Sequence, residues 1–387
     1  MTLKNFFYPR TIAVIGASDN PEKVGNVLMR KLCECKRKII PINNKRDEIQ
    51  GKKAYPSVRK YPGKIDLAVI AIPAPVVPKI IKQCGKKKIQ SIIIISSGFS
   101  EIGNKKLEEN VLKIAKKYNI RILGPNCFGI ANPYLNLDTT FSNTSPKKGN
   151  IAFISQSGAL FSYVSDFSIG FSGFVSLGNM SDLTFSDFIE YFNKDKKTKK
   201  IILYIEKVRH GKKFIEACQK SKKQILVVKA GKTEKGSKAA ISHTGSLATE
   251  FEIYKGAFKQ AKVKVFDTLA EAFGLKTQII KPKTKNIQIL TNAGGAAALI
   301  TDQLEEKGYN VKIKDLLGTA LAKDYKRALK KVKNPLVILT PQKMSEPEKT
   351  AKILSRKVIA CFLGNRSIKR ANQILKNKGI QYYKRCC

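Results

Sequence analysis

The sequence contains no tryptophan and only two histidines, His210 and His243, among 387 residues. It has eight cysteines, but none of them forms a C-x-x-C pair. With so few imidazoles and no paired cysteines, a zinc site is not expected. A disulfide framework is not expected either, because such frameworks are typical of small secreted chains. We therefore predict reduced, mostly buried cysteines and no resident metal.

Acidic residues are scarce. The chain has 29 Asp and Glu against 73 Lys and Arg, which gives a formal net charge of +44. A chain this basic could bind nucleic acid, so nucleic acid has to be considered as a partner. The lysines are nevertheless spread along the chain and form neither a basic arm nor a patch interleaved with aromatic residues, so nucleic-acid binding is not favoured. The charge is equally consistent with a lysine-rich surface of thermophilic type, and with attraction to anionic ligands and an acidic partner chain.

Long hydrophobic runs are also missing. No apolar run approaches the roughly 20 residues that span a bilayer, and the run at residues 91–97 has only the length of a strand. The N-terminus lacks the layout of a signal peptide. We therefore expect a cytoplasmic protein without a membrane partner. The 43% of apolar residues is ample for two or three globular domains in a chain of this length.

The first 125 residues alternate apolar runs with amphipathic stretches. Strands buried on both faces and separated by helix-length segments favour a parallel, doubly wound sheet, on which ligands bind outside the carboxyl ends of the strands. The expected strands are residues 11–15, 38–42, 67–72, 91–95 and 120–123, with helices between them such as 24–35 and 105–118.

Two further series of the same kind follow. The second has expected strands at 150–155, 174–177, 201–206 and 224–229, and helices at 185–193, 212–220 and 247–259. A Lys-rich linker with Pro282 separates it from the third, whose expected strands are 287–291, 336–339 and 358–362 and whose helices are 295–307 and 368–378. The chain is thus predicted to be α/β throughout.

The turn after the first expected strand reads IGASDNPEKVG, residues 15–25. Gly16 permits a tight turn, and Ser18, Lys23 and backbone amides can meet phosphate oxygens at the start of the next helix. The spacing is not G-x-G-x-x-G, so the dinucleotide fingerprint is absent. An ordinary glycine-containing turn remains the alternative.

Other strand ends of the first series carry loop signals as well. They are residues 41–43, 72–75, 96–101 and 124–129. Loops that follow parallel strands meet at one edge of the sheet, so together they are expected to line one crevice. Each loop taken alone is also explained by turn chemistry.

The second series opens with the strand-to-helix turn Ser155-Gln156-Ser157-Gly158-Ala159. Free amides, a helix dipole and two hydroxyls make this an anion-binding layout, although a serine N-cap without a ligand is the simpler alternative. Glu206 ends a later strand of the same series. A carboxylate at that edge can orient an imidazole and stabilise its charged form, whereas most such glutamates are only solvated.

His243 lies in KAGKTEKGSKAAISHTGSLA, residues 229–248, which is rich in small residues and has no hydrophobic period. A loop of small residues can move, and its amides can approach phosphate closely. We therefore interpret His243 as a candidate carrier of a phosphoryl group between two sites.

These motifs, taken together, resemble one family. The chain is similar to the alpha subunit of ADP-forming acetyl-CoA synthetase, an acetate–CoA ligase of the succinyl-CoA synthetase superfamily. The resemblance covers about residues 8–300, and the later part resembles the third domain of the family. The stretches that carry it are PRTIAVIGASDNPEKVGN, IPAP, SSGFSE, GPNCFGI, ISQSGAL, SLGNMSDL, ILYIEKVRHGKKFIEAC, VVKAGKTEKGSKAAISHTGSLA and ILTNAGGAA.

The resemblance implies a Rossmann-like CoA-binding domain over residues 1–130, followed by two flavodoxin-like domains over 145–280 and 286–387. The middle domain would carry the phosphohistidine loop, and the last one looks shortened between Val311 and Pro335. The residues that match the CoA site are Gly16, Ser18, Lys23, Gly25, Asn43, Pro73, Ser97 and Asn126. Those that match the phosphate site near the thioester are Ser155, Gln156, Ser157, Gly158 and Ala159.

In this resemblance His243 matches the histidine that is transiently phosphorylated, and Glu206 matches the glutamate that supports it. His210 matches no catalytic position and is expected on a surface loop, and covalent catalysis by Cys127 is not favoured. The implied reaction converts acyl-CoA, ADP and phosphate to a carboxylic acid, ATP and CoA. ADP, ATP and Mg²⁺ would bind to a separate ATP-grasp beta subunit, which gives a hetero-oligomer. The alternatives are a non-catalytic CoA-binding or regulatory homologue and a basic protein associated with nucleic acid.

Overall fold

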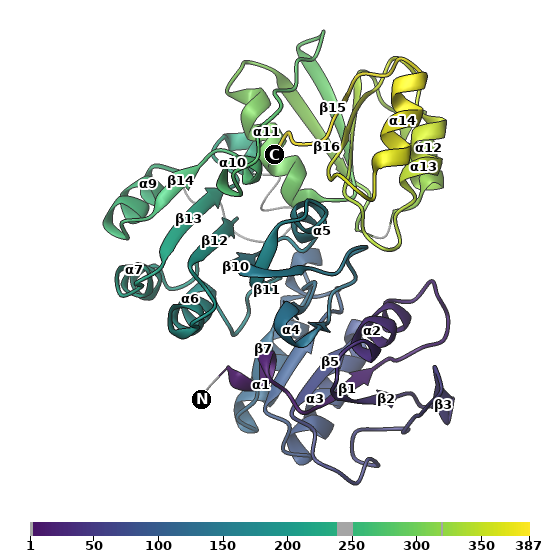
Figure 1. The fold of residues 1–387 in the computed structure, drawn as a ribbon, viewed down its shortest axis with the longest axis vertical. Coiled ribbons are helices and arrows are strands. Elements are labelled where there is room, and N and C mark those ends of the chain that lie inside the picture. Colours follow the sequence, from purple (N-terminus) through teal and green to yellow (C-terminus); the bar gives the residue numbers. More distant parts are fainter. Residues whose placement is uncertain (1–2, 238–250, 319) are drawn as a thin grey trace. The chain divides into compact units, whose positions relative to one another are not determined.

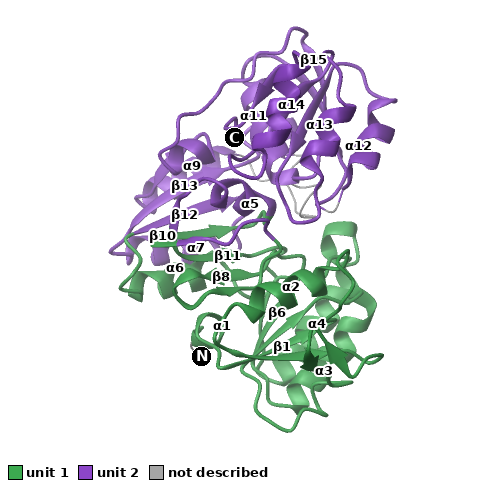
Figure 2. Ribbon diagram, turned by 45° about the vertical axis from the view of Figure 1, so that its right-hand side comes forward, with its two compact units in different colours: residues 1–141, 148–158, 171–199 green, residues 142–147, 159–170, 200–387 purple. Residues whose placement is uncertain are grey.

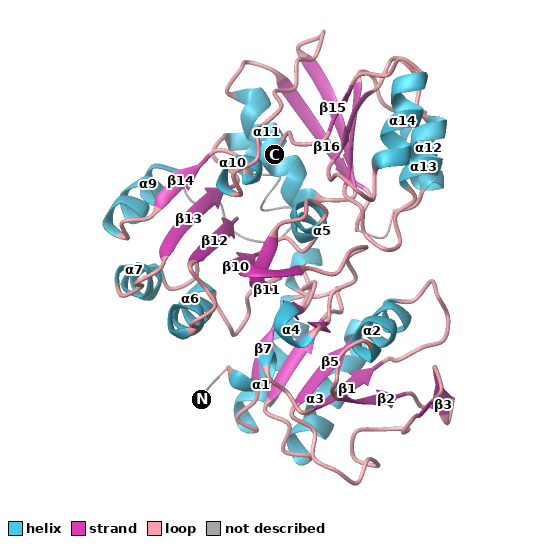
Figure 3. Ribbon diagram, viewed as in Figure 1, coloured by secondary structure: helices cyan, strands magenta, loops and turns pink. Residues whose placement is uncertain are grey.

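The computed structural model describes residues 3–237, 251–318 and 320–387. The chain divides into two compact units (Figure 2). Unit 1 comprises Met1–Phe141, Lys148–Gly158 and Phe171–Lys199, and unit 2 comprises Ser142–Lys147, Ala159–Gly170 and Lys200–Cys387. Both units are built from strands and helices that alternate along the chain (Figure 3), which agrees with the expected α/β class.

The first sheet of unit 1 has five parallel strands in the order β2-β1-β5-β6-β7. The strands are β1 (Thr11–Ile15), β2 (Lys38–Ile42), β5 (Leu67–Ile70), β6 (Ser91–Ile94) and β7 (Arg121–Leu123). Counted along the chain, this is the order 2-1-3-4-5, in which the direction of winding reverses between β1 and β5 (Figure 1). The loops after β1 and β5 therefore flank the position where doubly wound sheets bind ligands.

Helices cover both faces of this sheet. They are α2 (Val24–Cys33), α3 (Val77–Lys86) and α4 (Lys105–Lys117). Ala13 and Ile15 share one buried cluster with Ile81 of α3 and Val111 of α4. Side chains alternate along a strand, so the residues between them face the other side, where α2 contacts β1 and β2. Short elements complete this part: α1 (Lys4–Phe7), the hairpin β3 (Glu48–Ile49) and β4 (Lys52–Lys53), and 3₁₀ turns at Ala74–Val76 and Ser100–Ile102.

The remainder of unit 1 contains antiparallel pairs that the sequence pattern did not indicate. Strands β10 (Lys147–Ser155), β11 (Gly170–Ser176), β8 (Ile130–Asn132) and β9 (Leu137–Asp138) follow in this order across the sheet. β8 is antiparallel to both β9 and β11. β8 and β9 are too short to show a period of two, which is why they were missed. Helix α6 (Phe185–Lys194) begins at a capping box between Thr184 and Asp187.

Unit 2 contains the parallel strands β12 (Lys200–Ile205), β13 (Gln224–Lys229) and β14 (Lys264–Phe266). The helices associated with this part are α5 (Ala159–Ser165), α7 (Gly211–Gln219), α9 (Phe251–Gln260) and α10 (Leu269–Ala272). The expected helix 247–259 is described from Phe251 onward, and its first four positions lie outside the described residues.

Another parallel sheet of unit 2 repeats the order 2-1-3-4-5. Its strands are β16 (Asn310–Asp315), β15 (Asn286–Thr291), β17 (Pro335–Leu339), β18 (Ile359–Phe362) and β19 (Tyr382–Tyr383). Helices α12 (Ala322–Leu329), α13 (Pro347–Ile353) and α14 (Lys369–Asn377) share a buried cluster with one face, and α11 (Gly294–Glu305) contacts β15 and β16. β16 was not expected, because two of its six residues are lysine and mask the apolar pattern.

Within the described ranges, no helix combines the length and the apolar character required to cross a bilayer. All eight cysteines lie in these ranges and carry free thiols, and seven of them are buried. This agrees with the reduced thiols expected from the sequence.

Candidate functional site

The loop after β1 is packed so closely that two of its glycines accept no side chain. Gly16 has φ +91°, and a Cβ there would lie 2.3 Å from the carbonyl oxygen of Ala71, in the loop after β5. A Cβ on Gly25, in the first turn of α2, would lie 1.9 Å from the Gly16 carbonyl oxygen. The backbone of this turn therefore sits directly against the start of α2, as a phosphate-binding turn requires.

Side chains from two other elements hold this turn in place. Asn43, after β2, donates a hydrogen bond from Nδ2 to the Ala17 carbonyl at 2.9 Å. Asn26, which is buried in α2, donates to the carbonyls of Ser18 and Asp19 at 3.1 and 3.0 Å. Because these amides occupy carbonyl oxygens of the turn, its conformation is fixed by side chains from α2 and from the loop after β2. Lys23 is exposed at the N-cap of α2.

Hydrogen bonds also join the other three predicted loops. The Ile72 amide, next to Pro73, donates to Ser96 Oγ at 3.2 Å. The Asn126 amide donates to the Ser96 carbonyl at 2.9 Å. Pro73 and Ser97 are exposed, and Asn126 is half-buried with φ 55°. The structure thus brings the sequence-predicted loops after β5, β6 and β7 together at one edge of the sheet.

The segment around Asn179 connects these loops, and sequence reasoning gave it no role. Asn126 Nδ2 donates to Asn179 Oδ1 at 3.2 Å, and Asn179 Nδ2 lies 2.7 Å from Glu101 Oε2 and 2.9 Å from Glu108 Oε2. Glu108 is 5% exposed and also accepts hydrogen bonds from the amide and hydroxyl of Ser100. The signal in the sequence was SLGNMSDL, whose glycine-asparagine pair marks a tight turn rather than chemistry.

The predicted phosphate turn lies at the end of β10. Ser155 Oγ donates to the Ser157 carbonyl at 2.7 Å and accepts from the Ser157 amide at 3.2 Å, which closes a local turn. A Cβ on Gly158 would lie 2.1 Å from Cβ of Phe128, so the turn packs against the segment that follows Asn126. Ser155, Gln156 and Ser157 are buried, and α5 begins at Ala159.

The Ser157 hydroxyl is buried and has no hydrogen-bond partner among the described residues. Buried hydroxyl groups normally have a partner, so a hydroxyl without one is available to a ligand. This orphaned oxygen lies in the same turn as the predicted anion site.

Cys127 does not have the environment of a nucleophile. Its Sγ lies 3.2 Å from the Ile94 carbonyl, and it is 4% exposed. Burial raises the pKa of the Cys127 thiol to about 12, so the group is protonated at neutral pH. A thiol in this state is unreactive, since the thiolate is the nucleophile.

In unit 2, Glu206 follows β12 directly and is 6% exposed. The Tyr204 hydroxyl lies 3.1 Å from Glu206 Oε1 and 3.1 Å from the carbonyl of Gly295, in the first turn of α11. The carboxylate is therefore buried and held from the strand side, in contrast to a solvated glutamate at the end of a strand.

Lys229, at the end of β13, is 3% exposed. Its Nζ lies 4.4 Å from the centroid of the Tyr254 ring and donates to the Ala230 carbonyl. Burial lowers the pKa of Lys229 to about 8, while the nearby carboxylates of Asp302 and Glu206 act in the opposite direction. Burial also raises the pKa of the Asp302 carboxyl, which is 3% exposed. A buried cluster of charged groups thus lies where β12, β13 and α11 meet.

His243 lies outside the described residues, which resume at Phe251. His210 is exposed at the N-cap of α7 with φ 56°, on the surface loop expected for it. The described residues hold no group of three His, Cys, Asp or Glu side chains able to bind a metal ion.

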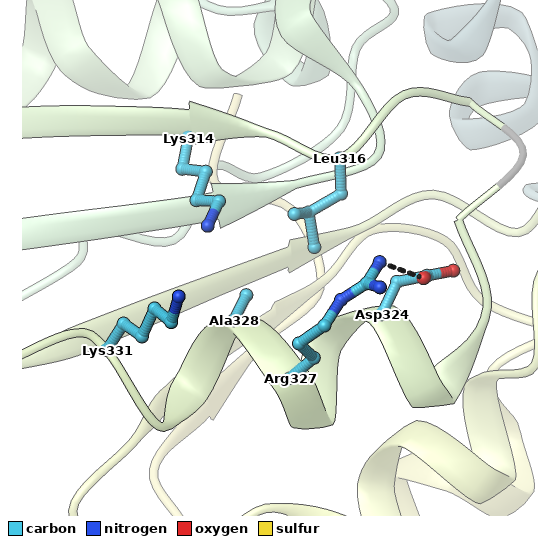
Figure 4. A pocket seen from close by; sticks show the side chains of 6 residues that line it. All are labelled: Lys314, Leu316, Asp324, Arg327, Ala328 and Lys331. Atoms are coloured by element: carbon cyan, nitrogen blue, oxygen red, sulfur yellow. Dashed lines mark hydrogen bonds and ion pairs between the residues drawn. The ribbon is translucent and has the colours of Figure 1, made fainter.

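A cavity of about 300 Å³ lies elsewhere in unit 2, between the end of β16 and α12 (Figure 4). It contains none of the sequence-predicted residues. Three cationic side chains line it, and Arg327 is paired with Asp324 at 3.0 Å. Because Lys314, Arg327 and Lys331 are exposed in a chain that is basic throughout, this groove does not stand out from the rest of the surface.

Comparison with protein families matches two segments of the chain. Residues 10–133 match a CoA binding domain, and residues 148–277 match the flavodoxin domain of proteins like succinyl-CoA ligase. The first segment contains the loops after β1, β5, β6 and β7. The second contains the Ser155–Gly158 turn, Glu206 and Lys229.

Two curated relatives are similar over nearly the whole chain. The alpha subunit of acetate–CoA ligase (ADP-forming) II from Pyrococcus furiosus is 42% identical over 91% of this chain and 79% of its own length. Acetate–CoA ligase (ADP-forming) I from Archaeoglobus fulgidus is 38% identical over 98% of this chain, which spans only 61% of that relative.

A solved structure is similar as well. It is the dinucleotide-forming acetyl-coenzyme A synthetase 1 of Ca. Korarchaeum cryptofilum, in complex with phosphate and ADP. The match has a TM-score of 0.68 and 34% identity, and covers 98% of this chain and 93% of the other.

Proposed function

The chain belongs to the family of ADP-forming acetate–CoA ligase alpha subunits, and we propose that it supplies the acyl-CoA half of such a ligase. The reaction converts acyl-CoA, ADP and phosphate to a carboxylic acid, ATP and CoA. The observation that carries the proposal is the 42% identity over 91% of the chain to an alpha subunit, of which 79% is covered. The activity, the substrates and the partner of this chain are proposals, as is the division into domains 1–130, 145–280 and 286–387.

CoA is proposed to bind at the switch point of the first sheet. Gly16, Ser18, Lys23 and Gly25 would hold phosphate, and Asn43, Pro73, Ser97 and Asn126 would line the crevice. The close approach of Gly25 to the Gly16 carbonyl supports this, because it sets the turn against the N-terminus of α2, where backbone amides and the helix dipole favour phosphate. The exposed ammonium group of Lys23 at the start of α2 supports a phosphate there.

Inorganic phosphate is proposed to bind at Ser155–Ala159, next to the thioester. A phosphate oxygen would attack the acyl carbonyl carbon, and the C–S bond would break to give acyl phosphate and CoA thiolate. The orphaned, buried hydroxyl of Ser157 supports an anion at this turn, since it leaves one hydrogen bond for the ligand. Positioning and electrostatic stabilisation of phosphate oxygens would supply most of the catalysis.

His243 is proposed to take the phosphoryl group from acyl phosphate, so that the P–O bond to the acyl group breaks and the carboxylate leaves. Glu206 would orient the imidazole and stabilise its positive charge. The phosphoryl group would then pass from His243 to the terminal phosphate oxygen of ADP. The burial of Glu206 and its contact with Tyr204 support a fixed orientation of the carboxylate.

The partner is proposed to be an ATP-grasp beta subunit that binds ADP, ATP and Mg²⁺. The alpha-subunit name of the relative implies a partner chain. The net charge of +44 supports attraction to anionic substrates and to an acidic partner surface.

The decisive experiment is coexpression with a candidate beta chain, followed by measurement of ATP formation from ADP and phosphate with several acyl-CoA substrates. Labelling with ³²P-phosphate and acyl-CoA should yield acid-labile phosphohistidine, and His243→Ala should abolish it. His210→Ala is the matched control and should label normally. Undiminished labelling of His243→Ala would contradict the mechanism.

Measurements of CoA binding and of nucleic-acid retention on the same protein distinguish the two alternative functions. CoA binding without any phosphohistidine would indicate a non-catalytic homologue. Retention of DNA or RNA at physiological salt, with steep salt dependence, would indicate a nucleic-acid partner.

A further inference from the structure

The segment that leads from β13 toward His243 is held by one buried carboxylate of α11. Asp302 Oδ2 accepts a hydrogen bond from the Gly231 amide at 2.8 Å. Asp302 Oδ1 accepts from the amides of Lys232 and Thr233 at 3.0 and 2.9 Å, and from the Thr233 hydroxyl at 3.0 Å. Four donors from three consecutive residues thus converge on a single side chain.

The same carboxylate lies at the start of a helical turn. Residues 234–237 are helical, and Thr233 Oγ1 accepts a hydrogen bond from the Gly236 amide at 3.0 Å, which makes Thr233 an N-cap. A carboxylate beside a helix N-terminus is stabilised by the helix dipole. Asp302 therefore fixes both the turn after β13 and the point at which the next helix begins.

The absence of a side chain at Gly236 leaves room for the Asp302 carboxylate. A Cβ at position 236 would lie 1.8 Å from Asp302 Oδ1, so any side chain there would displace the carboxylate. A second contact lies one turn along α11, where Glu305 accepts from the Lys235 amide at 3.3 Å and pairs with the Lys235 ammonium group at 3.1 Å. The first residues of the His243 segment therefore have two successive attachments to α11.

Helix α11 also contacts Tyr204, the residue that lies against Glu206. The Tyr204 hydroxyl, which lies against Glu206, is also within 3.1 Å of the Gly295 carbonyl in the first turn of α11. One helix of the C-terminal sheet thus supports both Glu206, through Tyr204, and the beginning of the His243 segment, through Asp302.

We propose that Asp302 is a positioning residue for phosphoryl transfer, which acts by holding residues 231–233, from which the chain continues toward His243. The inference rests on the proposed function, because it assigns Asp302 a role only if His243 is phosphorylated. Asp302 touches no substrate in this role and acts through the backbone of the segment. The C-terminal sheet thereby gains a part in the reaction through α11.

The test is a double-mutant cycle of Gly236→Ala and Asp302→Ala, read as the rate of phosphohistidine formation in the complex with the beta chain. Gly236→Ala alone should slow labelling by about tenfold or more, because the new methyl group displaces the carboxylate and its charge-assisted hydrogen bonds. In the Asp302→Ala background the carboxylate is already absent, so Gly236→Ala should add less than about twofold. Independent, multiplicative effects of the two substitutions would overturn the proposal.

Asp302→Asn keeps the size of the side chain and guards against loss of folding in Asp302→Ala. It should slow labelling from acyl-CoA and phosphate and from ATP to a similar extent, and leave CoA affinity unchanged. Faster hydrogen exchange of the amides of residues 231–233 should accompany it. Glu306→Gln changes the exposed carboxylate at the C-cap of α11; it is the matched control and should label normally.

The possible results distinguish a failure of the proposed function from a failure of the role assigned to Asp302. Absence of phosphohistidine in the unsubstituted protein would contradict the proposed function and, with it, the role of Asp302. Normal labelling of the unsubstituted protein together with an unchanged rate in Asp302→Asn would contradict the role of Asp302 alone.

Discussion

Lys229 is expected to make the protein more stable as the pH rises above 8. Its ammonium group is 3% exposed, and burial lowers its pKa from 10.5 to about 8 against the opposing effect of Asp302 and Glu206. In the unfolded chain the group keeps its ordinary pKa. Between pH 8 and 10.5 the unfolded chain therefore binds more protons at Lys229 than the folded protein does, so stability rises with pH in this window.

The size of the effect follows from the shift. Each pKa unit corresponds to about 1.4 kcal/mol, so a shift of roughly two and a half units changes the free energy of unfolding by about 3 kcal/mol. Below pH 7 the contribution is constant, because Lys229 is then charged in both states. In Lys229→Met this titration is absent. The unfolding free energy of the unsubstituted protein minus that of Lys229→Met should therefore increase by about 3 kcal/mol between pH 7 and 10.5.

Urea unfolding at several pH values, followed by far-ultraviolet circular dichroism, measures this difference. Circular dichroism is preferable because the chain has no tryptophan and 13 tyrosines, whose emission itself changes near pH 10. Lys264→Met removes an exposed lysine from the neighbouring strand β14 and corrects for the loss of one charge. A difference between the unsubstituted protein and Lys229→Met that stays constant from pH 7 to 10.5 would refute the reasoning.

Three further substitutions test separate parts of the structure. Glu206→Gln should slow phosphohistidine formation by about tenfold or more while the urea midpoint stays the same, and unchanged kinetics would remove its assigned role. Gly25→Ala should weaken CoA binding measured by calorimetry, because the added Cβ would lie 1.9 Å from the Gly16 carbonyl oxygen, whereas Gly256→Ala in open space should bind normally. Lys31→Met should lower the free energy of unfolding by about 3–5 kcal/mol, because it leaves Asp138 buried without the partner that lies 2.6 Å away. The pair between exposed Lys349 and half-buried Glu346 is its control, since Lys349→Met should change stability by less than about 1 kcal/mol.

Residues whose side chains bond to distant segments of the chain were the hardest to predict. Asn179 and Asp302 act by accepting or donating several hydrogen bonds to segments that lie 50 or more residues away in the sequence. Nothing in SLGNMSDL or in the apolar helix around Asp302 marks such a partner. Nothing in the sequence distinguished Lys229 from the many other lysines. Only its burial between β12, β13 and α11 sets it apart from the exposed lysines.

The apolar runs and turn residues of the sequence sufficed to predict the strands of the first sheet and the loops that follow them. Strands buried on both faces appear as continuous apolar runs, and the turns that follow them need glycine, serine and asparagine at fixed offsets, so both are local properties. Three features became known only from the folded chain: the distant side chains that hold those loops, the antiparallel pairing of β8 and β9, and the carboxylate that holds the segment after β13. These features depend on contacts between residues far apart in the chain. Such contacts produce no local hydrophobic periodicity and no characteristic composition, so the sequence pattern does not predict them.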